Sequence, residues 1–381
     1  MRAFTRIALS LGLVALAVAG GAAARATAAH RSDVVGHLYV NDNTAGANTI
    51  SGFDRHADGT LTPLPGSPFE AGGAGTGVGT GSQGALQLSG DGHYLLAVDA
   101  GSDQISVLRI KPNGRLTQAG GGPVWSGGHE PVSIAVHHDL VYVANAGDGA
   151  SNYTGFTLNP GGHLQPLAGS TFSLPDGSGP GDVLFNGDGS RLVGTRVNTS
   201  LIDSFAVGSS GLLVAAPGSP FTAQGLGPFG SEFSPTHTAQ LFVSNAHDGA
   251  GKGTVSAFDV ADNGVLSSIG SSPFADFQTA PCWVEISHDG SYLFTVNTAS
   301  SSISRYAIAA DGTLSLLGST SFNGNGAFDA RLAPDGDTLW VVDDGSNAVS
   351  GFAVHGGDLT ELPSSPTALP PHAAPFGIVV T

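Results

Sequence analysis

The sequence predicts an all-β fold, a seven-bladed β-propeller with four-stranded antiparallel blades, from three observations. The first is an internal repeat: seven short apolar segments each end in a polar or charged residue, at intervals of roughly 50 residues. We call these the anchor residues: Asn41, Asp99, Asn145, Arg196, Asn245, Asn297 and Asp343. A repeat of this length built from strand-like segments is typical of a propeller.

The second observation is that the copies pass through four strand-like runs. An apolar segment such as 131–136 or 281–286 comes first, and an Asp-Gly turn such as Asp289-Gly290 commonly follows. Asp-Gly suits tight hairpins because both residues tolerate a positive φ. The strongest apolar run then ends at the anchor residue, a third run carries an aromatic residue or Leu, and a Gly turn opens the fourth. Four strands in each of seven copies predict four-stranded blades.

The third observation concerns the two ends of the repeat. The first copy starts at His37 with a second-type strand, and the chain finishes at 374–380 with a segment that has the form of an inner strand. We therefore expect the C-terminal strand to pair into the first blade and close the ring. Such closure removes two open sheet edges.

Residues 1–29 are predicted to be a signal peptide and a short linker, and residues 30–381 a single propeller domain. Arg2 and Arg6 precede an apolar run at 7–18, and small residues at 24–28 fit a cleavage site. The apolar run is short for a membrane span, although an uncleaved anchor stays open as an alternative. We expect a secreted, periplasmic or cell-surface protein with no stable membrane insertion after signal removal.

Charge narrows the classes of partner. The chain has a net charge of −17, and removal of residues 1–28 leaves 10 basic and 30 acidic residues, a net charge of −20. Nucleic acids and anionic membranes need clustered Lys and Arg, so neither is expected as a partner. We expect a monomer that takes a small molecule or a carbohydrate. Cys282 is the single cysteine, which excludes an intramolecular disulfide.

The candidate site lies in the central channel, because alternate residues of the inner strands face it. Aligning the copies concentrates polar residues there on blades four to seven. They are Asp182, Glu232, Glu285, Asp329 and Arg331, with Trp283 beside them. In one interpretation Arg331 holds an anionic ligand while Glu232 or Glu285 acts as a base. In the other, Arg331 pairs with the carboxylates and fills the channel.

Two further residues are candidates outside this group. His129 precedes an inner strand at the expected channel mouth, where it could act in catalysis or be an ordinary loop residue. Arg196 breaks the column of Asn and Asp anchors and could hold substrate or pair with a nearby acid. His137-His138-Asp139 stands at a turn, and because neighbouring strand residues point to opposite sides we expect no shared metal. No phosphate loop, zinc spacing or nucleophile elbow is present, so no cofactor and no metal site are expected.

The repeat resembles the seven-bladed lactonase family, which includes bacterial 6-phosphogluconolactonases and fungal muconate cyclases. The resemblance rests on the Pro-led inner strands, the Asp-Gly turns and the segments 292–306 and 310–322, and covers about residues 36–381. It implies a seven-bladed propeller that opens or forms a lactone. Family members with known activity carry a Gly-Pro-Arg-His run and an Asn-Glu pair.

At the corresponding positions this sequence differs. The run reads Gly179-Pro180-Gly181-Asp182, and the strand end reads Arg196-Val197. A second His-bearing loop of the family corresponds to 127–131, which contains His129. Two functions therefore stay open: an extracytoplasmic hydrolase for a lactone or related small acid at the channel mouth, and a non-catalytic propeller that binds a protein, glycan or small ligand through its loop-rich face.

Overall fold

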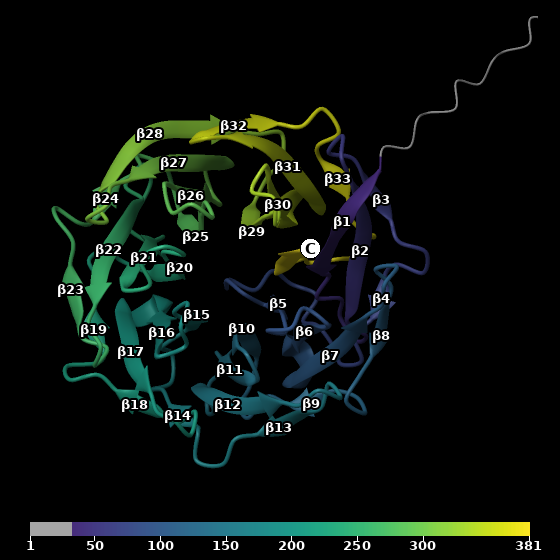
Figure 1. Cartoon of the computed structure of the whole chain (residues 1–381), viewed down its shortest axis with the longest axis horizontal. Helices are drawn as coiled ribbons and strands as arrows, with labels where there is room; N and C mark the ends of the chain where they lie inside the picture. Colours follow the sequence, from purple (N-terminus) through teal and green to yellow (C-terminus); the bar gives the residue numbers. More distant parts are fainter. Residues whose placement is uncertain (1–32) are drawn as a thin grey trace, which may run out of the picture. The chain divides into compact units, whose positions relative to one another are not determined.

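The computed structural model describes residues 33–381, and the predicted signal peptide lies outside them. Seven antiparallel sheets stand around a central channel like the blades of a propeller (Figure 1), which confirms the predicted fold. Each sheet is a blade of four main strands, which are successive in the chain except in the first blade, whose inner strand comes from the C-terminus. In every blade but the sixth, an additional two-residue strand pairs with the third strand.

Strand positions repeat from blade to blade, numbered one to seven along the chain. The inner strands are β34 (Ile378–Val380), β5 (Leu86–Leu88), β10 (Pro131–His137), β15 (Pro180–Phe185), β20 (Pro228–Phe233), β25 (Pro281–Ile286) and β29 (Ala327–Leu332). The second strands are β1 (Val34–Asn41), β6 (Tyr94–Asp99), β11 (Leu140–Asn145), β16 (Arg191–Arg196), β21 (Gln240–Asn245), β26 (Tyr292–Asn297) and β30 (Thr338–Asp343).

The outer part of each blade completes the sheet. The third strands are β2 (Thr49–His56), β7 (Gln104–Ile110), β12 (Asn152–Leu158), β17 (Leu201–Val207), β22 (Thr254–Val260), β27 (Ser302–Ile308) and β31 (Ala348–His355). The fourth strands are β3 (Leu61–Pro63), β8 (Leu116–Gln118), β13 (Leu164–Pro166), β18 (Leu213–Ala215), β23 (Leu266–Ser268), β28 (Leu314–Ser321) and β32 (Asp358–Glu361). The short additional strands are β4 (Phe69–Glu70), β9 (Val124–Trp125), β14 (Phe172–Ser173), β19 (Phe221–Thr222), β24 (Phe274–Ala275) and β33 (Thr367–Ala368).

The ring closes as predicted. β34 pairs antiparallel with β1, with Leu38 opposite Val380 and Val40 opposite Ile378. The carbonyl of Thr381 also accepts hydrogen bonds from the peptide N–H of His37 at 3.1 Å and from the Arg55 guanidinium. In Figure 1 the C-terminal strand accordingly lies beside the N-terminal blade. The first blade is thus built from both ends of the described chain.

Neighbouring blades are joined by apolar packing and by buried tyrosines. A hydroxyl buried in an apolar core needs a hydrogen-bond partner. Tyr39 donates to the carbonyl of Gly114 at 2.7 Å, and Tyr142 donates to that of Gly211 at 2.8 Å. In both pairs the acceptor lies in the next blade. The tyrosines of these second strands therefore fill the core and also form hydrogen bonds to the next blade.

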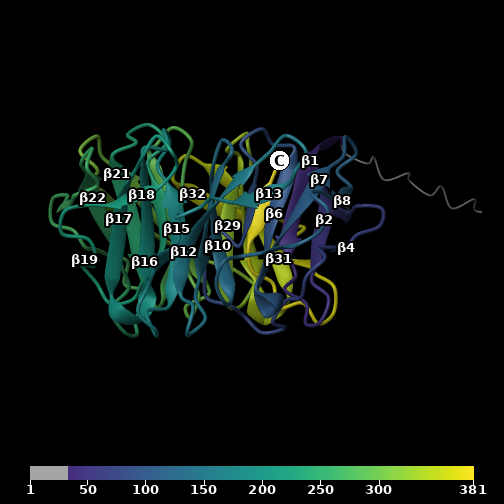
Figure 2. The ribbon, with the colours of Figure 1, turned by 90° about the horizontal axis from the view of Figure 1, so that it is seen from below.

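Each anchor residue ends a second strand, and the anchors bond mainly to the third strand of their own blade. Asn145 donates to Asn152 at 2.9 Å, and the Asn297 amide oxygen accepts the Ser304 hydroxyl at the same distance. Paired inner and second strands place Pro131 opposite Asn145 and Pro281 opposite Asn297. We call this end of the propeller the anchor face, and the opposite end, which carries the hairpin turns between inner and second strands, the turn face. Figure 2 shows the ring from the side, with connecting loops at both ends of the strands.

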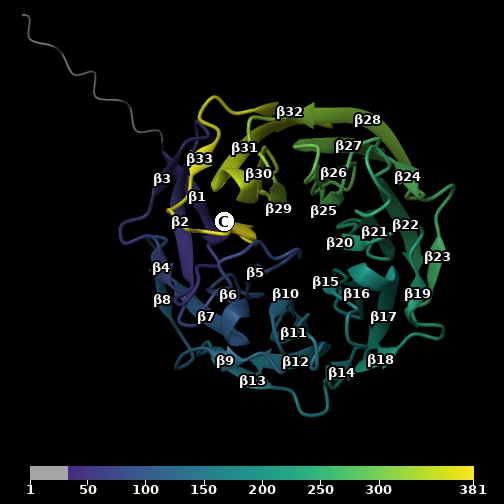
Figure 3. The same ribbon diagram turned by 180° about the vertical axis from the view of Figure 1, so that it is seen from behind.

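One connection crosses the channel instead of following the rim. Residues 80–84, which we call the channel segment, lead into β5 and reach toward the middle of the ring (Figure 3). The peptide N–H of Gln83 donates to Gly181 in blade four at 2.9 Å, and its side chain donates to Ser231 in blade five at 3.0 Å. The carbonyl of Ser82 accepts from the Trp283 indole in blade six at 2.7 Å. Blade two is thereby tied to blades on the far side of the ring.

Within residues 33–381, no helix has the length and apolar character needed to cross a membrane.

Candidate functional site

The structure brings three of the predicted site residues together inside the channel. Arg331 Nη1 lies 3.4 Å from Glu285 Oε2, and Glu285 Oε1 accepts the peptide N–H of Leu332 at 2.8 Å. The Glu285 side chain is 5% exposed and that of Arg331 26%. Glu232 is near enough that the charge of Glu285, after burial, raises the pKa of Glu232 well above its usual range. Arg331 is therefore engaged by the carboxylates around it.

Two more of the predicted residues are buried beside this group. Asp182 accepts hydrogen bonds from the hydroxyl and peptide N–H of Ser231 at 2.6 and 2.9 Å. Asp329 accepts from the peptide N–H of Gly84 in the channel segment at 3.4 Å. Burial raises the pKa of Asp182 to about 7 and that of Asp329 to about 6. Both carboxyls carry a proton for part of the neutral pH range.

Trp283 lies beneath the channel segment. Its side chain is fully buried, its indole N–H donates to Ser82, and its ring packs edge-on against Phe229 and Phe328. A ligand could reach this ring only if the channel segment moved. The side chain contributes to packing and to holding that segment in place.

His129 and Arg196 both lie toward the anchor face, and each has an acidic partner. His129 Nδ1 lies 2.7 Å from Asp103 Oδ2, and the histidine is exposed. Arg196 forms two hydrogen bonds with Asp203 at 2.6 and 2.5 Å, and the Asp203 side chain is fully buried. The guanidinium of Arg196 is thus committed to a contact within blade four.

A cavity of about 270 Å³ lies on the anchor face, between blades three to five and the channel segment. We call it the mouth pocket. Its polar lining residues are Thr80, Glu130, Asn198 and His247, and its apolar walls include Val132, Val197 and Phe229. The polar residues come from connections in different blades, which the sequence repeat does not align. For that reason the sequence analysis missed Glu130, Asn198 and His247, although Glu130 adjoins the candidate His129.

Glu130 is the ionisable group of the mouth pocket with a shifted pKa. Burial, and then the charges of Asp103 and Asp148, raise the pKa of this half-buried carboxyl. Its peptide N–H donates to Asp103 at 2.8 Å, and its φ is +51°. Within residues 33–381 its carboxylate has no hydrogen-bond partner. A carboxylate with a raised pKa and free lone pairs is suited to accept a proton from water.

The remaining groups of the mouth pocket favour an uncharged ligand. Its lining contains no Lys and no Arg. Arg196 and Arg331, the nearby arginines predicted to bind substrate, are held by Asp203 and Glu285. An anionic carboxylate or phosphate would therefore face Glu130 with no cation to offset it.

The described part of the chain offers no metal-binding cluster. Within residues 33–381 there is no group of three or more His, Cys, Asp or Glu residues placed to hold a metal ion. The neighbouring rings of His137 and His138 are in edge contact, with centroids 4.2 Å apart.

Comparison with known proteins identifies the family. The model described as Lactonase, 7-bladed beta-propeller matches residues 13–179 and 232–375. The chain therefore belongs to the family of seven-bladed β-propeller lactonases. The stretch between the matched segments, 180–231, contains Gly181, Asp182 and Arg196, where the expected family pattern is replaced. No curated protein matches the chain.

Solved structures share the fold at low sequence identity. The chain resembles a proposed 6-phosphogluconolactonase from Bacteroides uniformis with 21% identity and a TM-score of 0.73, over 90% of this chain and 98% of the other. It also resembles the periplasmic gluconolactonase PpgL of Pseudomonas aeruginosa with 19% identity and a TM-score of 0.71, over the same shares of the two chains. At these identities the likeness shows a common architecture, and activity has to be argued from the site.

Proposed function

We propose that this protein is an extracytoplasmic hydrolase that opens an uncharged lactone in the mouth pocket. The observation that carries the proposal is that an unpartnered carboxylate with a raised pKa, Glu130, and an imidazole, His247, line one cavity at the channel mouth. Membership of the lactonase family supports the reaction class. The basic and apolar pattern of residues 1–29 supports export.

The reaction follows from the groups present. Glu130 takes a proton from a water molecule as the water oxygen adds to the lactone carbonyl. The Asn198 amide and the Thr80 hydroxyl can donate hydrogen bonds to the resulting oxyanion. The ring C–O bond then breaks, and the proton passes from Glu130 or His247 to the departing alkoxide oxygen. The product is a hydroxy acid, whose negative charge favours its release from an acidic protein.

The channel residues form a second possible centre for the same chemistry. Glu285, Glu232 and Arg331 would act only on a ligand that enters from the turn face, because the channel segment lies between this group and the anchor face. We therefore place the principal site in the mouth pocket and keep Glu285 and Arg331 as comparison positions in the test.

The test is the hydrolysis of a panel of lactones. The rate is measured from the protons released, by titration at constant pH. The panel includes glucono-δ-lactone and 6-phosphogluconolactone, and the variants are Glu130→Gln and His247→Asn. We expect turnover of the uncharged lactone, a loss of about 100-fold or more in Glu130→Gln, and a smaller loss in His247→Asn. Glu70→Gln, a carboxylate elsewhere on the anchor face, should retain full activity.

Three results would contradict this assignment. Full activity in Glu130→Gln with loss in Glu285→Ala or Arg331→Ala would move the site into the channel. Preference for the phosphorylated lactone would contradict the uncharged substrate. If no substrate of the panel were hydrolysed, the proposed enzymatic function would be rejected.

Non-catalytic ligand binding is the second candidate. A specific feature favours it: Gly181 and Val197 stand where the family pattern has Arg and Glu. Binding of glucono-δ-lactone without hydrolysis, lost in Glu130→Gln, would support this function over the first.

A further inference from the structure

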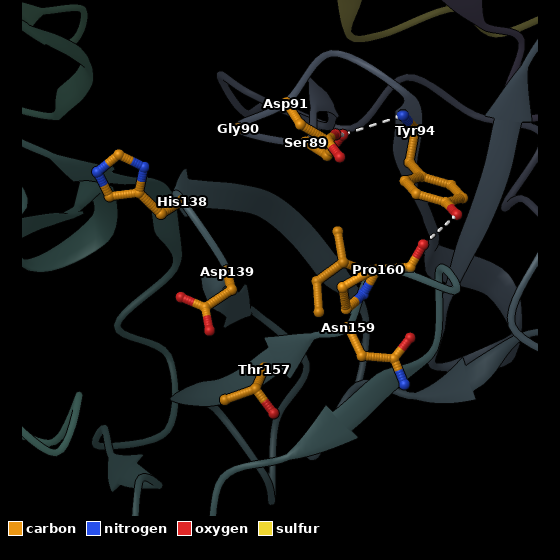
Figure 4. Close-up of a pocket in the computed structure, with 10 residues that line it drawn as sticks. Ser89, Gly90, Asp91, Tyr94, His138, Asp139, Thr157, Asn159 and Pro160 are labelled. Carbon is orange, nitrogen blue, oxygen red and sulfur yellow. Dashed lines mark hydrogen bonds between the residues drawn. The ribbon is translucent and has the colours of Figure 1, made fainter.

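A second cavity, of about 560 Å³, opens on the turn face between blades two and three. Figure 4 shows the residues around it: Ser89 and Asp91 from one hairpin turn, His138 and Asp139 from the next, and Thr157 and Asn159 from the end of β12 and the turn after it. We call it the turn-face pocket. It lies at the opposite end of the propeller from the mouth pocket, and the proposed reaction does not use it.

The cavity coincides with an irregularity of the repeat. Two residues, His138 and Asp139, separate β10 from β11, whereas five residues separate β15 from β16 and β25 from β26. The hairpin from Pro131 to Asn145 is shorter than the corresponding one from Pro180 to Arg196. The cavity lies beside this short turn, the end of β12 and the turn of blade two. Gly90 lets the neighbouring turn approach, because a Cβ there would lie 2.8 Å from the His138 Cα.

The cavity lining presents unused side-chain hydrogen-bonding groups of both kinds. Asn159 Oδ1 accepts the peptide N–H groups of Gly161 and His163 at 2.9 and 3.0 Å, which leaves the Asn159 amide N–H₂ as a free donor. Within residues 33–381 the Thr157 hydroxyl and the Asp139 carboxylate have no hydrogen-bond partner. The cavity therefore offers a donor, an acceptor and a hydroxyl that can serve as either.

The charge of the cavity is largely offset. Asp91 accepts the Ser89 hydroxyl at 2.6 Å and the His93 peptide N–H at 3.0 Å, and it pairs with the His93 ring. Asp139 is the acidic group left without a partner. Leu158, Pro160 and the ring of Tyr94 supply an apolar wall. The Tyr94 ring is fixed, since its hydroxyl donates to the Pro160 carbonyl at 2.9 Å.

From this arrangement we infer that the turn-face pocket binds an uncharged polyhydroxylated ligand, of the size of one or two sugar rings. Vicinal hydroxyls can donate to Asp139 and accept from Asn159, while the C–H face of the ring packs on Leu158 and Pro160. A cavity of this volume is within the range of small-molecule sites. The inference is independent of the proposed lactonase reaction, because the two pockets share no residue.

The test is ligand titration of the full domain by calorimetry and saturation-transfer NMR. The probes are D-glucose, D-galactose and myo-inositol, with putrescine as a cationic comparison. We expect at least one of the three polyols to bind, insensitive to salt, and about tenfold or more weaker in Asp139→Ala and Thr157→Val. Asp188→Asn, at the corresponding turn of blade four, should bind as the parent does.

A graft provides a second, independent measurement. Residues 137–139 are replaced by residues 186–190 of blade four, which lengthens the short turn by two residues. We expect the graft to lose binding while keeping its melting temperature. If the graft does not fold, the binding measured in the point variants Asp139→Ala and Thr157→Val decides whether the inference holds. Undiminished binding in Asp139→Ala and Thr157→Val, binding of putrescine alone, or no binding of any polyol would overturn the inference.

Discussion

Arg196 and Asp203 form a buried ion pair that joins the end of β16 to β17 in blade four. Two hydrogen bonds of 2.6 and 2.5 Å connect them, and the Tyr153 hydroxyl donates to the same carboxylate at 3.0 Å. In blade five the corresponding pair is Asn245 and Ser256, which are both neutral. Blade four thus uses two opposite charges where a neighbouring blade uses an amide and a hydroxyl.

This pair predicts a specific pattern of stabilities. Asp203→Ala leaves the Arg196 guanidinium buried and unpaired, which should lower the free energy of unfolding by about 3–5 kcal/mol. The double variant Arg196→Asn with Asp203→Ser reproduces the pair of blade five and should lie within about 1 kcal/mol of the parent. Urea unfolding measures both. Equal destabilisation by the single and double changes would contradict the interpretation.

The second prediction concerns pH. Several buried aspartates have raised pKa values: Asp42, Asp99, Asp182, Asp329 and Asp343. Burial raises the pKa of Asp343 to about 7 from its ordinary 3.8. Between these values the folded state binds more protons than the unfolded state, so stability falls as pH rises. We expect a lower free energy of unfolding at pH 8 than at pH 5.

A matched variant isolates one of these groups. Asp343→Asn keeps the shape and is the residue found at four other anchor positions. It should stabilise the protein at pH 8, by about 1–3 kcal/mol more than it does at pH 5. Aspartates with lowered pKa values, such as Asp91 at about 2, contribute equally at both pH values. A gain of the same size at pH 5 would show that deprotonation is not the cause.

The third prediction concerns ring closure. Deleting residues 374–381 removes β34 and leaves the inner edge of β1 unpaired. We expect the melting temperature of the whole domain to drop by about ten degrees or more, which corresponds to a loss of stability on the order of a few kcal/mol. Deleting Thr381 alone removes its contacts with Arg55 and His37 but keeps the strand pairing, and it should have a smaller effect. An unchanged melting temperature in the longer deletion would refute the role of β34.

The fourth prediction concerns the channel segment. The Gln83 side chain donates to the Ser231 carbonyl at 3.0 Å and accepts the Val284 peptide N–H at 3.1 Å. Gln83→Ala leaves these buried groups unpaired and should cost about 1–3 kcal/mol. Gln165→Ala, at an exposed position of β13, should cost less than about 0.5 kcal/mol. Differential scanning calorimetry compares them, and equal effects would contradict a bridging role for Gln83.

The repeat was readable from the sequence because it is a local property. Strand alternation, Gly turns and polar anchors recur at a regular spacing, and they predicted the number of blades, their four strands and the closing strand. The same alignment placed Glu232, Glu285 and Arg331 in one column, and the structure brings them together. Local hydrogen bonding likewise explains why the anchor residues are polar. Each of them ends a buried apolar strand, where its side chain bonds to nearby polar groups.

The mouth pocket could not be predicted in this way. Glu130, Asn198 and His247 lie outside the aligned strands, in connections of different blades, and they meet only because the ring brings those connections together. The path of the channel segment is also a tertiary outcome, since nothing in a glycine-rich connection predicts hydrogen bonds to blades four, five and six.

The sequence by itself determined the architecture of this protein, because each blade is specified by short-range alternation and turn chemistry repeated seven times. The tertiary structure decided which charged side chains are free to contact a ligand. It paired Arg196 with Asp203 and Arg331 with Glu285, and among residues 33–381 it left the Glu130 carboxylate at the channel mouth without a hydrogen-bond partner. Partner choice among charged groups depends on distance and burial in the closed ring, which spacing along the chain does not encode.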